Sequence, residues 1–161
     1  MRLALAYAAL VALVGGQIAY FYDRLPDRVA SHFNASGFAN GYMSRGGFVE
    51  FYAGLVVFLM VVFGGVALTF RAVPVALINL PNKDYWFAKE REESSRAWLS
   101  REMGAFGLVV ILFIAGVMQR VFMVNTTGER PCLPTSFVLG WMGALVAVIF
   151  VMAFRMLRRF S

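Results

Sequence analysis

The sequence predicts an all-α integral membrane protein, a four-helix bundle with an ordered outer loop and a cytoplasmic juxtamembrane helix. Three observations lead to this fold class. First, 60% of the 161 residues are hydrophobic and only 15% are charged, whereas a soluble domain carries about 25% charged residues. Second, the apolar residues form long blocks, and a helix of about 20 apolar residues crosses a hydrocarbon core. Third, backbone polar groups in lipid must be satisfied within their own segment, which makes each block a helix.

Four blocks are expected to span the membrane within a single transmembrane domain, residues 1–161. They cover residues 3–22, 48–70, 103–124 and 137–154. An outer loop is expected at 23–47 and a cytoplasmic connector at 71–102. The first block is also compatible with a signal peptide, but it exceeds the roughly 7–15 residues of a signal core and ends in three interfacial aromatic residues.

The positions of Lys and Arg predict the orientation. Of the 15 Lys and Arg residues, ten fall in the N-terminus, the connector and the C-terminal tail. Cytoplasmic loops carry the excess of positive charge, so both termini are expected in the cytoplasm of a multi-pass cell-membrane protein. The net charge of +6 fits this topology and attraction to anionic headgroups, so the bilayer, and not nucleic acid, is the expected partner. A cytoplasmic or membrane protein and a second copy of the chain are further candidates.

The outer loop contains the only histidine and many turn residues. Pro26 favours extended geometry before it, and Gly37 and Gly41 can take positive φ. We expect residues 27–33 to form one or two amphipathic helical turns within an ordered cap. An unperturbed histidine side chain changes charge near neutral pH, which makes His32 a candidate ligand contact or pH-sensitive group. In the alternative interpretation it is a surface histidine bound to a backbone carbonyl.

Three polar residues, Gln17, Glu50 and Arg120, fall near the outer ends of predicted spans, where polar groups are costly to bury. We expect a Glu50–Arg120 pair with Gln17 beside it, forming the floor of an outer cavity roofed by His32 and Asn34. These five residues are the candidate ligand-binding site. Alternatively, Arg120 reaches the interface and Glu50 stabilises the start of its helix.

The connector carries a second motif, NLPNKDYWFAKEREE, at residues 79–93. Its prolines interrupt the preceding helix, and Asn82 or Asp84 can cap a helix that begins near Tyr85 and lies on the inner membrane surface. A Glu92–Arg96 pair at i, i+4 is expected there. The segment is either a docking surface for a cytoplasmic partner or a membrane anchor and connector. Its candidate residues are Asn79, Pro81, Asn82, Tyr85, Trp86, Glu90 and Arg91.

Together the two motifs resemble a bacterial membrane family of largely unknown function, whose domain occurs at the N-terminus of SdpI-type immunity and signalling proteins. The outer motif is YDRLPDRVASHFNASGFANGYMSR, and the connector motif is similar to the family's Asn-x-Pro-Asn…Tyr-Trp passage. The matched positions are Leu25, Pro26, Val29, His32, Asn34, Gly37, Gly41, Asn79, Pro81, Asn82, Tyr85, Trp86, Ala88, Glu90 and Arg91. The chain departs from the family at Lys89, where Pro is frequent, and it lacks the additional helices of full immunity proteins.

Three classes of function follow from these features. A binding, signalling or immunity-like protein that senses an extracytoplasmic ligand is favoured. A small membrane transporter or enzyme with an outer polar cavity and a structural subunit of a membrane complex are the alternatives. No catalytic motif is evident, and Cys132 and His32, each the only residue of its type, make a poor metal site, so neither enzymatic activity nor a cofactor is expected. Asn34 and Asn125 match glycosylation acceptors, which matter only in a eukaryotic secretory pathway.

Overall fold

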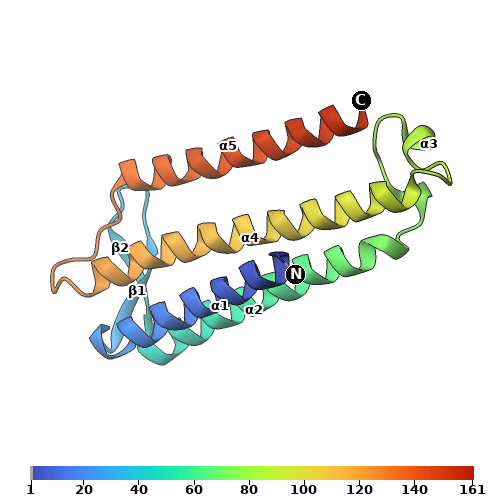
Figure 1. Ribbon diagram of the computed structural model, residues 1–161. Coiled ribbons are helices and arrows are strands. Elements are labelled where there is room, and N and C mark those ends of the chain that lie inside the picture. The colour runs from blue at the N-terminus through green and yellow to red at the C-terminus, as the bar shows by residue number, and fades with distance from the viewer. Residues whose placement is uncertain (1) are drawn as a thin grey trace.

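Four long helices, each antiparallel to the next along the chain, dominate the computed structural model (Figure 1). The structure describes residues 2–161, so Met1 lies outside it. The long helices are α1 (Arg2–Phe21), α2 (Arg45–Thr69), α4 (Glu92–Asn125) and α5 (Thr135–Phe160). Each is long and apolar enough to cross a membrane. This confirms the predicted all-α membrane fold.

Short elements close the two ends of the helices. The hairpin end carries η1 (Tyr22–Arg24), β1 (Arg28–Phe33) and β2 (Ala39–Ser44). The connector end carries η2 (Phe70–Ala72), η3 (Val75–Leu77) and α3 (Lys83–Trp86). Figure 1 shows the hairpin at one end and α3 beside the C-terminus at the other. The two sequence motifs therefore lie at opposite ends of the molecule.

The expected helical turns at residues 27–33 are wrong, because Arg28–Phe33 forms β1, antiparallel to β2. The turn between the strands explains the difference. Oδ1 of Asn34 accepts hydrogen bonds from the backbone N–H groups of Ser36 and Phe38, both at 3.0 Å. Gly37 then takes a φ of +83°, so the chain reverses at once and the flanking residues pair as strands.

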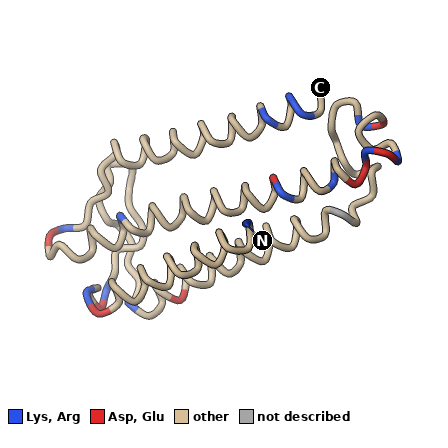
Figure 2. The backbone as a smooth tube through the Cα atoms, viewed as in Figure 1, with Lys and Arg blue, Asp and Glu red and all other residues tan. Residues whose placement is uncertain are grey.

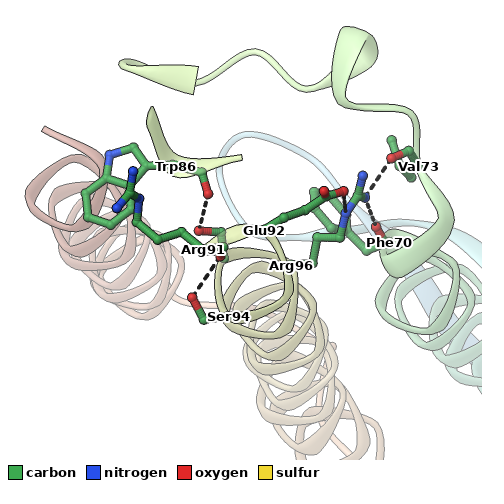
Figure 3. Close-up of polar contacts among 8 residues, drawn as sticks. Phe70, Val73, Trp86, Arg91, Glu92, Ser94 and Arg96 are labelled. Atoms are coloured by element: carbon green, nitrogen blue, oxygen red, sulfur yellow. Dashed lines mark hydrogen bonds and ion pairs between the residues drawn. The ribbon is translucent and has the colours of Figure 1, made fainter. Parts of the chain in front are cut away.

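The connector also differs from the expected surface helix. The helix α3 has only four residues, and the polar stretch after it belongs to α4, which is 34 residues long. The expected Glu92–Arg96 pair forms at 2.9 Å. Arg96 also donates to the carbonyl oxygens of Phe70 and Val73 (Figure 3). These bonds fix η2 against the start of α4, which extends beyond the apolar block as one continuous helix.

The main core lies between α1, α2 and α4 and reaches up to the hairpin. Phe122 of α4 is fully buried and contacts the rings of Phe21, Phe48 and Tyr52. Of α5, which is described in full, only Phe160 is buried, and it belongs to a second, smaller core at the connector end. The bundle is thus a three-helix core to which α5 is attached.

Candidate functional site

Gln17 lies in a hydrogen-bonded network within the three-helix core. Its Nε2 donates to the carbonyl oxygen of Ala115 at 3.1 Å and to Oε1 of Gln119 at 2.9 Å. Its Oε1 accepts a hydrogen bond from the hydroxyl of Tyr52 at 2.8 Å. The side chain of Gln17 joins α1, α2 and α4, and both ends of its amide are hydrogen-bonded. Gln17 therefore acts as a packing residue of the core.

The expected Glu50–Arg120 pair does not form within residues 2–161. Phe122 packs against both α1 and α2, and two positions along a helix turn by about 200°, so Arg120 lies away from that core contact. It borders a hollow of about 460 Å³ with Tyr20 near the end of α1, and its Nε is buried without a hydrogen-bond partner among the described residues. Glu50 is exposed on the second turn of α2. The charged floor expected for the cavity is therefore absent.

His32 and Asn34, in contrast, do border a cavity. It measures about 510 Å³ and lies between the hairpin, α4 and the start of α5, within the range of small-molecule sites. Its walls are largely apolar and include Phe113, Val117, Phe137 and Trp141. Its polar edge consists of Ser31, His32, Asn34 and Thr135. His32 and Asn34 therefore border a cavity as expected, but the walls of that cavity are apolar.

Two side-chain nitrogens of the polar edge, one on His32 and one on Asn34, are left to bind a ligand. Nδ1 of His32 lies 3.1 Å from Oγ of Ser31, and in the described residues its Nε2 has no hydrogen bond. Oδ1 of Asn34 is used in the turn, which leaves its Nδ2 available as a donor. Gly41 of β2 lies so close to His32 that an added Cβ would be 3.0 Å from the Cβ of His32. The hairpin therefore holds the histidine in place.

Asn125 fixes the hairpin over α4, a role that sequence reasoning missed. It is only 7% exposed, so it is a packing residue and not a glycosylation acceptor. Its Oδ1 accepts from the N–H of Ala30 at 2.7 Å, and its Nδ2 donates to the carbonyl oxygens of Ala30 at 3.1 Å and Val121 at 2.9 Å. The amide thus pairs with the N–H and carbonyl groups of Ala30, in the way that a neighbouring strand would pair with β1. Only its place at the end of an apolar block hinted at this role.

The segment before α5 completes the roof. The N–H of Leu133 donates to the carbonyl oxygen of Gly37 at 2.8 Å, and the N–H of Ala39 donates to that of Pro131 at 3.1 Å. The cavity wall is then set by Trp141, whose Nε1 donates to the carbonyl oxygen of Phe113 at 3.0 Å. Its ring lies over Gly116, where an added Cβ would be 2.1 Å away. An added Cβ would force the Trp141 ring to shift, so glycine favours this docking of α5.

The connector motif binds the end of α5. Nε1 of Trp86 donates to the carbonyl oxygen of Phe160 at 3.0 Å, and Nδ2 of Asn82 donates to that of Ser161 at 3.1 Å. The carbonyl oxygen of Trp86 accepts from Oγ of Ser95 at 2.9 Å (Figure 3). The sequence suggested Asn82 or Asp84 as the cap of a helix here, but the side chain of Asn82 makes no capping hydrogen bond to α3. These contacts support the connector interpretation of the motif.

The other motif residues lie at the surface of the connector. Nε of Arg91 donates to the carbonyl oxygen of Tyr85 at 2.8 Å, and its guanidinium lies 3.8 Å from the centre of the Tyr85 ring. Asn79, Pro81 and Glu90 are exposed. No group of three His, Cys, Asp or Glu side chains among residues 2–161 is arranged to hold a metal ion.

Residues 8–64 match the model of a domain of unknown function, DUF1648. The matched segment comprises most of α1, the hairpin and most of α2, and it contains the outer motif but not the connector motif. No curated protein and no solved structure matches the chain. The chain is thus a membrane-embedded protein whose first two long helices and hairpin are similar to the DUF1648 domain.

Proposed function

We propose that this protein is a binding and signalling protein of the cell membrane that senses an extracytoplasmic ligand in the cavity beneath the hairpin. The observation that carries the proposal is the cavity of about 510 Å³, whose size suits a small ligand. Its apolar walls and its short polar edge, with His32 and Asn34, fit a molecule with an apolar body and a small polar end. The immunity-like role implied by the sequence resemblance would use the same site.

Binding is favoured over catalysis at this site. The contact between Oγ of Ser31 and Nδ1 of His32 is the kind that activates a nucleophile. However, the two residues are neighbours on a strand, and His32 is exposed. Within the described residues, no acidic side chain orients the imidazole. We therefore propose that the histidine recognises the ligand and does not act as a base.

A role as a structural subunit of a larger complex is the second candidate. The feature that favours it is α5, on which large apolar side chains such as Leu139 and Phe150 are about 70% exposed. Lipid alone can cover such residues, since lipid tails are as apolar as the side chains. The cavity, which a purely structural subunit does not require, makes binding the preferred function.

Native mass spectrometry of the protein purified from its own membranes tests the proposal. We expect a bound small molecule that survives gentle purification. Val138→Trp should expel it, because Val138 lines the cavity, whereas Val148→Trp, at a similarly exposed position on the same helix, should retain it. His32→Ala should lose the molecule without lowering thermal stability. Equal occupancy in all four proteins would refute the site.

The proposed orientation places the hairpin end outside the cell and both termini in the cytoplasm. Single cysteines at the exposed positions Ser36 and Ser94, introduced into a Cys132→Ser background, test it. An impermeant maleimide applied to intact cells should label position 36 and spare position 94. The reverse pattern would place the cavity on the cytoplasmic side and exclude an extracytoplasmic ligand.

A further inference from the structure

A second apolar groove lies between α4 and α5 at the connector end. It measures about 180 Å³, and Trp98, Met103, Phe106, Ile149 and Met152 are among its lining residues. It is separate from the hairpin cavity, with which it shares no residue. Apart from Glu102, which pairs with Arg155, its walls are apolar side chains of two membrane-spanning helices, so its natural occupant is a hydrocarbon chain.

A basic rim adjoins this groove. Arg155, Arg158 and Arg159 line a hollow of about 290 Å³ together with Trp98, and Trp98 also lines the groove. The three arginines are spaced i, i+3 and i+4, which places them on one face of α5. Figure 2 shows basic residues on the last turns of α5.

The rim carries more positive charge than the protein neutralises. Nη2 of Arg155 lies 2.9 Å from Oε1 of Glu102. Arg158 and Arg159 form no ion pair in the part of the chain that the structure describes. The guanidinium of Arg159 lies 4.5 Å from the ring centre of Trp86, which orients it without cancelling its charge.

We propose that the groove and rim together bind one anionic phospholipid. The phosphate would be held by Arg158 and Arg159, since a guanidinium presents paired donors to phosphate oxygens, and one acyl chain would enter the groove. Basic pockets between membrane helices are known to hold anionic headgroups, and Trp98 suits the depth of the headgroups. A second copy of the chain fits poorly, because it would bring the same positive charge to the rim.

Tryptophan quenching by brominated lipids tests the site. The full chain with Trp141→Phe retains Trp86 and Trp98, both of which contact Phe160 beside the rim. In phosphatidylcholine nanodiscs, brominated phosphatidylglycerol should quench this protein more than brominated phosphatidylcholine at the same mole fraction. Arg158→Gln should lower that preference about fivefold, the usual effect of one arginine near anionic lipid.

Three controls distinguish a bound phospholipid from bulk charge attraction and from a soluble anion. Arg28→Gln removes the same charge at the hairpin end and should leave the preference unchanged; an equal loss would mean bulk attraction only. Excess glycerol phosphate should not relieve the quenching; full relief would mean a site for soluble anions. Ala153→Phe, which fills the groove, should weaken the quenching, and an unchanged signal would exclude a bound acyl chain. Equal quenching by the two lipids would overturn the proposal.

Discussion

The two sides of α4 are packed in opposite ways. Toward α1 and α2, α4 presents glycine and buried apolar residues in close contact. An added Cβ at Gly107 would lie 2.4 Å from the Cβ of Phe63 and from the hydroxyl oxygen of Tyr7. Toward α5, contacts concentrate near two points, where Trp141 docks on Gly116 and where Arg155 pairs with Glu102.

This difference shows which helix interface stabilises the protein and which one leaves room for cavities. Lipid supplies no hydrophobic force between helices, so association depends on close packing and hydrogen bonds. The interface of α4 with α1 and α2 has both, including the Gln17 network. The interface with α5 is held near its ends, which leaves one cavity near the hairpin and one groove near the connector. Under the proposed function, α5 is therefore the helix expected to respond to ligands.

Removal of the central aromatic side chain should have the largest effect. Phe122→Ala empties the contact with three other rings in the core. The cavity should lower the free energy of unfolding by about 2–3 kcal/mol, less than in a soluble protein because the transfer term is absent in lipid. Phe150→Ala on α5, at a side chain that is 71% exposed, should change it little. Unfolding in mixed micelles measures both variants, and equal losses would refute the contrast.

Loss of the Asn125 amide should release the hairpin. Asn125→Leu leaves the N–H and carbonyl of Ala30 without their partners, at a cost of about 2 kcal/mol. Hydrogen exchange in residues 28–33 should accelerate while α1 and α2 remain protected. Thr126→Val, which removes one exposed hydroxyl bond to Met123, is the control. Unchanged exchange in the leucine variant would mean that the strands pair independently of α4.

Paired glycine substitutions compare the two sides of α4 directly. Gly107→Ala should cost about 1–2 kcal/mol, because the atom it meets, the Cβ of Phe63, lies next to a backbone and cannot rotate away. Gly116→Ala meets the ring of Trp141, so α5 should move outward at a smaller cost. A distance between spin labels on α4 and α5 should lengthen only in the second variant. Gly143→Ala, with nothing within 4 Å, is the control.

The spans were predictable because apolar composition alone determines which segments enter lipid. The start of α4 was not predictable, because residues 92–102 are mostly polar and hydropathy detects only the part of a helix that lipid surrounds. The hairpin was missed for a related reason. Val29 and Phe33 are spaced for a helix, but the turn at Asn34 and the amide of Asn125 determine the local structure from outside the strand.

The candidate site was half predictable. The loop chemistry identified His32 and Asn34, which do border the cavity. The predicted charged floor was wrong because sequence position gives the depth of Gln17, Glu50 and Arg120 in the membrane but not the direction in which each side chain points. Phe122 occupies the face of α4 toward α1 and α2, and Arg120, two positions away, cannot share that face. The cavity itself arises where α4 and α5 fail to pack, and no single residue encodes such a gap.

The smallest expected effects come from removing one hydrogen bond on each side of α4. Tyr52→Phe deletes the donor to Oε1 of Gln17 in a site where Tyr52 is 0% exposed, so the amide oxygen has no replacement partner. Hydrogen bonds between membrane helices contribute about 0.6 kcal/mol on average and up to about 1.7 kcal/mol, and we expect a cost of about 1 kcal/mol here.

Trp141→Phe also deletes one donor, to the carbonyl oxygen of Phe113. That oxygen lies within α4 and can still accept a helical hydrogen bond, and α5 can adjust beside the cavity. We expect a loss of a few tenths of a kcal/mol, below the average for such bonds. Unfolding in mixed micelles, with both variants measured side by side, gives the two costs. If Trp141→Phe costs as much as Tyr52→Phe, then α5 is held as rigidly as the core and is not the responsive helix.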